Sequence, residues 1–181
     1  MNVRFRRTGA RRYAVVVTVA GEPPRAMDPA PGYDDDIPHD IVHYVVEAEL
    51  HLASGVYGRA AQGAGTFIAI ADHDVSPRER ARQQRKQRRR ERALGAADAG
   101  QTADMAQSER IAGLCDVAWR RKHGQRPDPS RSAPVPRTED AAAIERVVSR
   151  LDAIAPLWRA LPVGEELVFE WPSVVPTSES R

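Results

Sequence analysis

Residues 3–19 read VRFRRTGARRYAVVVTV, and this stretch predicts the β-structure on which the fold is built. Two runs rich in β-branched and aromatic residues, 3–7 and 12–19, flank a short loop around Gly9, where glycine can supply the positive φ of a tight hairpin. Near the other end of the chain, residues 166–171 read ELVFEW and predict a third strand. We therefore expect an α+β fold with a small antiparallel sheet formed from both termini.

Three further segments, 37–52, 104–123 and 138–158, have the apolar spacing of helices. The first is apolar on two sides, so we expect it to be buried against more than one neighbour. Asp36 is expected to cap that helix. Pro156 is expected to kink or end the last helix, because proline removes a backbone donor and clashes with the preceding turn.

The chain has 181 residues, the length of one ordinary domain, which we expect over residues 1–175. Composition predicts a linker at 125–137 and a flexible tail at 172–181. No apolar run is long enough to cross a bilayer, so we expect no membrane span. The single cysteine, Cys115, cannot form an internal disulfide, and we expect a small core residue there and a cytoplasmic location.

The segment 37–52 carries the pattern that most suggests chemistry. Five polar side chains form one stripe along it, at His39, Asp40, His43, Glu47 and His51. Two imidazoles spaced i and i+4 can reach one metal ion, and a carboxylate one turn further can add a ligand or orient a histidine. We therefore predict that a divalent metal such as zinc binds at four of these positions: His39, Asp40, His43 and Glu47.

Two other interpretations of this stripe stay open. In one, the same residues form a metal-dependent hydrolase with Asp40 or Glu47 as the base. The order of residues differs from the HExxH zinc peptidases, because Asp40 stands where those enzymes have glutamate. In the other, the stripe is structural, and His43 and Glu47 form hydrogen bonds inside the fold.

A longer resemblance rests on several separate segments, which include the arginine-rich stretch after residue 75. The run Tyr33–Leu52, the glycines that follow it and the segment 161–164 (LPVG) together resemble a group of bacterial proteins with a PHD[IL]VH[YF]VVE core. This resemblance implies the order of the segments and no activity.

The formal charge of +2 hides a strongly basic segment. Residues 75–92 carry 9 basic and 2 acidic side chains, which gives +7. A proline and a capping box at residues 76–79 predict a helix over 76–95, and its lack of an apolar stripe predicts that it projects from the domain.

Such a helix can neutralise phosphates and bind nucleic acid without reading bases. The predicted nucleic-acid contacts are Arg78, Arg82, Arg85, Lys86, Arg89 and Arg92. Four alternatives stay open: a solvated connector helix, pairing with the acidic stretch 22–51 of the same chain, an acidic protein partner, and an anionic membrane surface, for which the helix lacks an apolar face.

Overall fold

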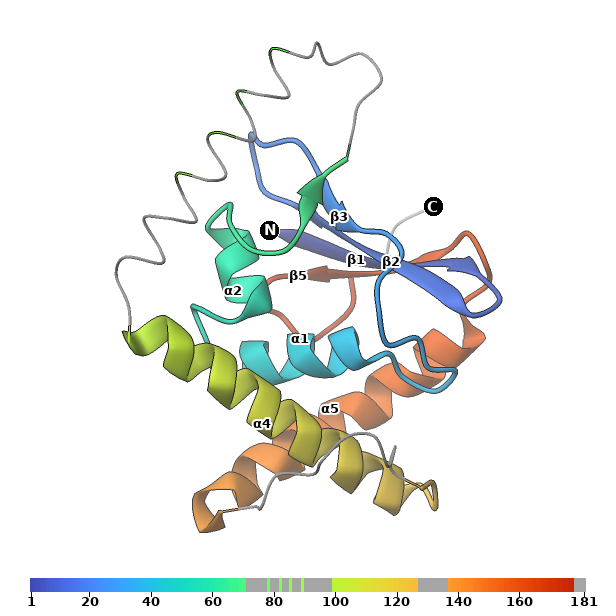
Figure 1. Cartoon of the computed structure of the whole chain (residues 1–181). Helices are drawn as coiled ribbons and strands as arrows, with labels where there is room; N and C mark the ends of the chain where they lie inside the picture. The colour runs from blue at the N-terminus through green and yellow to red at the C-terminus, as the bar shows by residue number, and fades with distance from the viewer. Residues whose placement is uncertain are drawn as a thin grey trace.

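The structure is a computed structural model that describes residues 1–70, 78, 82, 85, 89, 99–126 and 137–177. This part of the chain holds a five-stranded antiparallel sheet of strand order β4-β3-β2-β1-β5, with helices against one of its faces (Figure 1). The strands are β1 (Asn2–Gly9), β2 (Arg12–Thr18), β3 (Arg25–Met27), β4 (Ile68–Ala69) and β5 (Glu166–Glu170). The helices are α1 (His39–Glu49), α2 (Val56–Ala61), α4 (Ala99–Lys122) and α5 (Ala141–Ala160), the last preceded by a 3-10 turn (Thr138–Asp140). The α+β class predicted from the sequence is confirmed.

Strand β1 lies at the point where the two ends of the chain meet. Val3 pairs with Val17 of β2 on one side and with Phe169 of β5 on the other. The prediction of a sheet formed from both termini is therefore confirmed. Strands β3 and β4 were not expected, because they are only three and two residues long and lack an alternating run of their own.

Helix α1 runs through the middle of the core, between the sheet and the helices α4 and α5 (Figure 1). All eight residues from Ile41 to Ala48 are buried, including the polar pair His43 and Glu47. The expectation that this helix is buried on more than one side is confirmed. Any polar group on it must consequently find its partners inside the protein.

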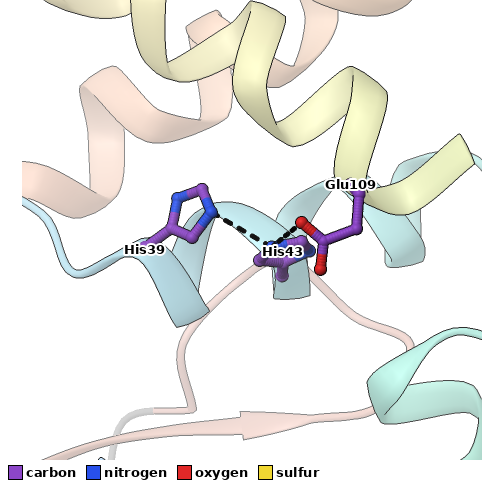
Figure 2. Close-up of side chains that lie close together, drawn as sticks. All are labelled: His39, His43 and Glu109. Carbon is purple, nitrogen blue, oxygen red and sulfur yellow. Dashed lines mark hydrogen bonds and ion pairs between the residues drawn. The ribbon is translucent and has the colours of Figure 1, made fainter. Parts of the chain in front are cut away.

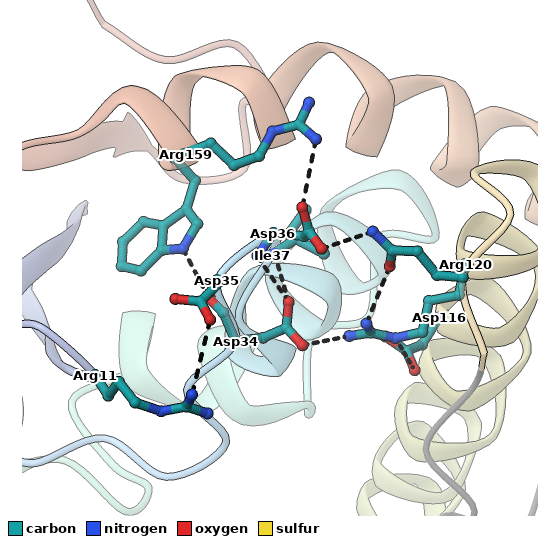
Figure 3. Close-up of polar contacts among 10 residues, drawn as sticks. Arg11, Asp34, Asp35, Asp36, Ile37, Asp116, Arg120 and Arg159 are labelled. Atoms are coloured by element: carbon teal, nitrogen blue, oxygen red, sulfur yellow. Dashed lines mark hydrogen bonds and ion pairs between the residues drawn. The ribbon is translucent and has the colours of Figure 1, made fainter.

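The loop before α1 fixes where that helix begins. Asp34 accepts hydrogen bonds from the backbone amides of Asp36 and Ile37, at 2.9 and 3.0 Å, and its other oxygen takes a 2.9 Å contact from Arg120 (Figure 3). The expected cap at Asp36 is wrong, since the structure shows no side-chain cap on α1 and the helix begins only at His39. The carboxylate two residues earlier organises the turn instead.

Three arginines from separate parts of the chain face the acidic run 34–36 (Figure 3). The pairs are Arg120–Asp34 at 2.9 Å, Arg159–Asp36 at 3.4 Å and Arg11–Asp35 at 3.9 Å. The acidic stretch 22–51 is one of the partners considered for the arginine-rich segment. Three of its carboxylates, Asp34, Asp35 and Asp36, already have arginine partners from other parts of the chain.

Helix α5 passes through Pro156 and ends at Ala160, so the helix does not end at this proline, and the expected kink stays a prediction. Proline removes a single backbone hydrogen bond here. The apolar face of α5 is buried on both sides of it, at Ile154 and Trp158, and that packing favours a continuous helix.

The predicted basic helix, linker and tail lie partly or wholly outside the described residues. The predicted basic helix over 76–95 lies outside them except for four positions, and residues 127–136 of the predicted linker lie outside them altogether. Of the expected flexible tail, residues 172–177 turn back along β5, where Pro176 bridges Phe169 and the amide of Thr177 donates to the carbonyl of Val168. No helix within the described ranges is long and apolar enough to cross a membrane.

Cys115 is fully buried on α4, as expected of a core residue. Burial raises the pKa of its thiol to about 12, which favours the neutral thiol of a core residue over the reactive thiolate.

Candidate metal centre

Two histidines of α1 and one glutamate of α4 converge at the contact between these helices (Figure 2). One ligand atom from each of His39, His43 and Glu109 can be chosen so that all three lie within 4.8 Å of one another. His43 is buried, His39 is half-buried, and the side chain of Glu109 is 63% exposed. The group is therefore anchored in the core and open towards solvent.

The two distances from His43 to the other ligand atoms are close to those between ligands of one small metal ion. Nε2 of His43 lies 3.2 Å from Nε2 of His39 and 3.6 Å from Oε2 of Glu109. Two donor atoms about 2.0–2.1 Å from a tetrahedral zinc ion lie roughly 3.3–3.4 Å apart. Both distances from His43 are therefore compatible with shared coordination of one ion, and the exposed side chain of Glu109 would have to adjust towards His39.

A chain of buried hydrogen bonds fixes the orientation of His43. Nδ1 of His43 lies 3.0 Å from Oγ of Ser108, and that hydroxyl lies 2.9 Å from Oε1 of Glu47. Because the Glu47 carboxylate can only accept, Ser108 donates to it and accepts from the Nδ1–H of His43. This assignment places the lone pair of His43 on Nε2, the atom that points towards the other two ligands.

Glu47 is held as a carboxylate anchor rather than as a ligand. Its two oxygens accept hydrogen bonds from the backbone amides of Val56 and Tyr57, each at 2.8 Å, and the amide of Gly58 lies 3.4 Å away. Burial raises the pKa of Glu47, and the hydrogen bonds from these amides and from Ser108 partly offset that rise. The carboxylate thereby connects the start of α2 to α1 and accepts the hydrogen bond that orients the Ser108 hydroxyl.

The structure separates the four predicted ligands into two groups. His39 and His43 lie next to each other. Glu47 is instead connected to His43 through a hydrogen bond to Ser108. Asp40 lies elsewhere, with Oδ2 only 2.5 Å from the hydroxyl of Tyr13. Among the described residues, the group of side chains that could hold an ion contains neither carboxylate, so direct ligation by Asp40 and Glu47 stays a prediction that this geometry does not support.

His51, the last member of the stripe, lies after the end of α1 with a φ of 53° and an exposed side chain. The helix ends at Glu49, so the four-residue spacing no longer places His51 on the same face.

Glu109 was missed by the sequence analysis. It lies 66 residues beyond His43 on another helix, and only the packing of α4 on α1 brings the two together. The spacing of residues along one helix carries no information about such a partner.

The structure describes four of the six residues that are predicted to contact nucleic acid. Arg78, Arg82, Arg85 and Arg89 have helical backbone and exposed side chains. Lys86 and Arg92 lie outside the described residues.

The comparisons with known proteins identify no relative of this chain. No family profile matches the chain, and no curated protein or solved structure matches it significantly.

Proposed function

We propose that this chain binds one divalent transition-metal ion of the zinc class through His39, His43 and Glu109. The observation that carries the proposal is the convergence of the three ligand atoms, within 4.8 Å, at a histidine whose other nitrogen is already oriented by Ser108. Metal-binding histidines characteristically have this kind of second hydrogen bond, which fixes the tautomer and raises ligand affinity.

The ligand types favour a borderline metal ion over calcium or magnesium. Two imidazoles suit Zn²⁺, Fe²⁺ and related ions, whereas Ca²⁺ and Mg²⁺ require sets of oxygen ligands. Three protein ligands leave at least one coordination position of such an ion unfilled. The side chain of Glu109 is itself exposed to solvent.

The hydrolase interpretation receives less support than metal binding itself. It requires Asp40 or Glu47 as a base next to the metal, but Glu47 is occupied by backbone amides and Ser108. Asp40 has a short hydrogen bond with Tyr13. The proposal is therefore metal binding, without an assigned reaction.

The decisive experiment measures the metal content of untagged protein purified without imidazole or chelator. Mass spectrometry should find close to one zinc-class ion per chain, either as purified or after reconstitution and gel filtration. His43→Ala and Glu109→Gln should each reduce the retained metal severalfold or more. The matched control is His51→Asn, which removes an exposed histidine outside the centre and keeps a residue that tolerates positive φ.

Two results would overturn the proposal. One is the absence of metal from the reconstituted wild-type protein. The other is an equal loss of metal in His51→Asn and His43→Ala, because that would indicate nonspecific binding by surface histidines.

A second candidate function is weak, sequence-independent binding of nucleic acid through the arginine-rich segment. It is favoured by four arginines, Arg78, Arg82, Arg85 and Arg89, which have helical backbone and exposed side chains and follow one another at spacings of three and four residues. Fluorescence anisotropy with a single-stranded RNA 20-mer should show affinity that falls steeply with salt. Replacing these four arginines by glutamine should lower the affinity and flatten the salt dependence, whereas Arg121→Gln, on the exposed end of α4, should leave both unchanged.

A further inference from the structure

A cavity of about 600 Å³ lies away from the metal centre, between the N-terminal halves of α4 and α5 and beside the end of α1. Its volume is in the range of sites that bind small molecules. None of His39, His43 and Glu109 lines it, so a ligand bound here would not compete for the metal ligands.

The lining of this cavity carries more positive than negative charge. Three arginines, Arg110, Arg137 and Arg146, line it together with one acid, Asp140. Arg110 is already committed to that acid, because its two terminal nitrogens contact the two oxygens of Asp140 at 2.5 and 2.9 Å. This pair is close to neutral as a unit.

The other two arginines supply the excess charge. Arg137 donates its backbone amide to Asp140, at 2.9 Å, a bond that does not use its guanidinium group, although the charge of that group also helps to lower the pKa of Asp140. Arg146 makes a long 3.7 Å contact with Glu49, whose nearer partner is Arg150 at 2.9 Å. The side chain of Arg146 is about half exposed.

The base of the cavity is apolar. Ile111 is buried, Leu50 and Ala143 are half-buried, and further alanines of α4 and α5 complete the wall. A cavity lined by both apolar side chains and arginines combines hydrophobic contact with recognition of an oxyanion, whose geometry matches the arginine fork.

We propose that this cavity binds a small organic anion, with its carboxylate or phosphate group between Arg137 and Arg146 and its apolar body against Leu50, Ile111 and Ala143. The bound anion offsets the charge that Asp140 leaves unbalanced. The apolar body fills space that would otherwise hold water against hydrophobic side chains.

Isothermal titration of the full chain with four probes tests this proposal. Phenyl phosphate and benzoate carry both an oxyanion and an apolar body, benzyl alcohol lacks the charge, and inorganic phosphate lacks the ring. We expect saturable binding of at least one aromatic anion, at least tenfold tighter than benzyl alcohol or inorganic phosphate. The ratio of the phenyl phosphate and benzoate affinities tells which headgroup the site prefers.

Three variants locate the binding. Arg137→Ala and Arg146→Ala should each weaken it about tenfold, and Ala143→Leu should block it by filling the base. Arg150→Ala is the matched control, because it lies one turn beyond Arg146 on α5, is equally exposed and does not line the cavity.

The proposal is overturned if neither aromatic anion binds, if benzyl alcohol or inorganic phosphate binds as tightly as the aromatic anions, or if Arg150→Ala weakens binding as much as Arg146→Ala. None of these results bears on the metal centre, which the same protein samples test separately by metal content.

Discussion

Oγ of Ser108 lies 3.0 Å from Nδ1 of His43, although 65 residues separate them in the chain. The same hydroxyl lies 2.9 Å from the buried carboxylate of Glu47, so one serine on α4 joins two polar residues of α1. Both contacts are inside the core, where an unmade hydrogen bond is expensive. Ser108 therefore couples the packing of α4 on α1 to the orientation of a proposed metal ligand.

Ser108→Ala should weaken metal binding while leaving all three proposed ligands in place. The variant removes the acceptor of the His43 Nδ1–H, and loss of such a supporting bond typically lowers metal affinity about 10–100-fold. Competition with a chromogenic chelator measures the change. Ser149→Ala, at an exposed position of α5, is the control. Unchanged affinity in Ser108→Ala, alongside a loss in His43→Ala, would contradict the positioning role.

Glu47→Gln should destabilise the fold. Both oxygens of Glu47 accept from backbone amides of α2, and glutamine would turn an NH₂ group towards at least one of these donors. Lost hydrogen bonds to a buried charged group cost about 1.5–3 kcal/mol each. Urea unfolding should show a loss of at least that size, compared with a change within about 0.5 kcal/mol for Glu145→Gln on the exposed face of α5. Equal stability of the two variants would show that the amide contacts are not needed.

Gly55→Ala should be destabilising because of space rather than backbone conformation. The φ of Gly55 is −72°, which any residue can adopt, but an added Cβ would lie 2.3 Å from Cδ of Glu47. The carboxylate would have to leave the amides of α2. Gly9→Ala is the comparison, since its Cβ would meet only Cβ of Arg12 at 3.4 Å. Thermal unfolding should show a clearly lower midpoint for Gly55→Ala than for Gly9→Ala, and equal midpoints would contradict the close approach.

The sequence predicted the parts of the fold that depend on local pattern. The strands at both ends and the three long helices each have a period that one segment reveals by itself. Strands β3 and β4 have no such period, since they form only by pairing with β2 and with each other. The passage of α5 through Pro156 depends equally on packing that the sequence of one helix does not contain.

The same division applies to the candidate site. The i, i+4 spacing on one helix correctly placed His39 next to His43. That spacing does not distinguish a ligand from a residue that supports a ligand, so it predicts Glu47 as a metal ligand. It also could not identify Glu109 or Ser108, because both come from α4, whose register against α1 is set by the tertiary packing.

The pair formed by Asp140 and Arg110 should make stability depend on pH in the acid range. Two hydrogen bonds from Arg110 and one from the Arg137 amide lower the pKa of Asp140 to about 2, from 3.8 in an unfolded chain. Between these two values the unfolded state binds more protons than the folded state, so folding loses stability as the pH falls. The contribution of Asp140 is therefore complete above about pH 4 and is lost progressively towards pH 2. Urea midpoints at pH 5, 3.5 and 2.5 should show wild type more stable than Asp140→Asn at pH 5, with the difference shrinking as the pH falls. A difference that stays constant over this range would mean that Asp140 does not titrate with the lowered pKa, and that Arg110 does not hold it as a charged partner.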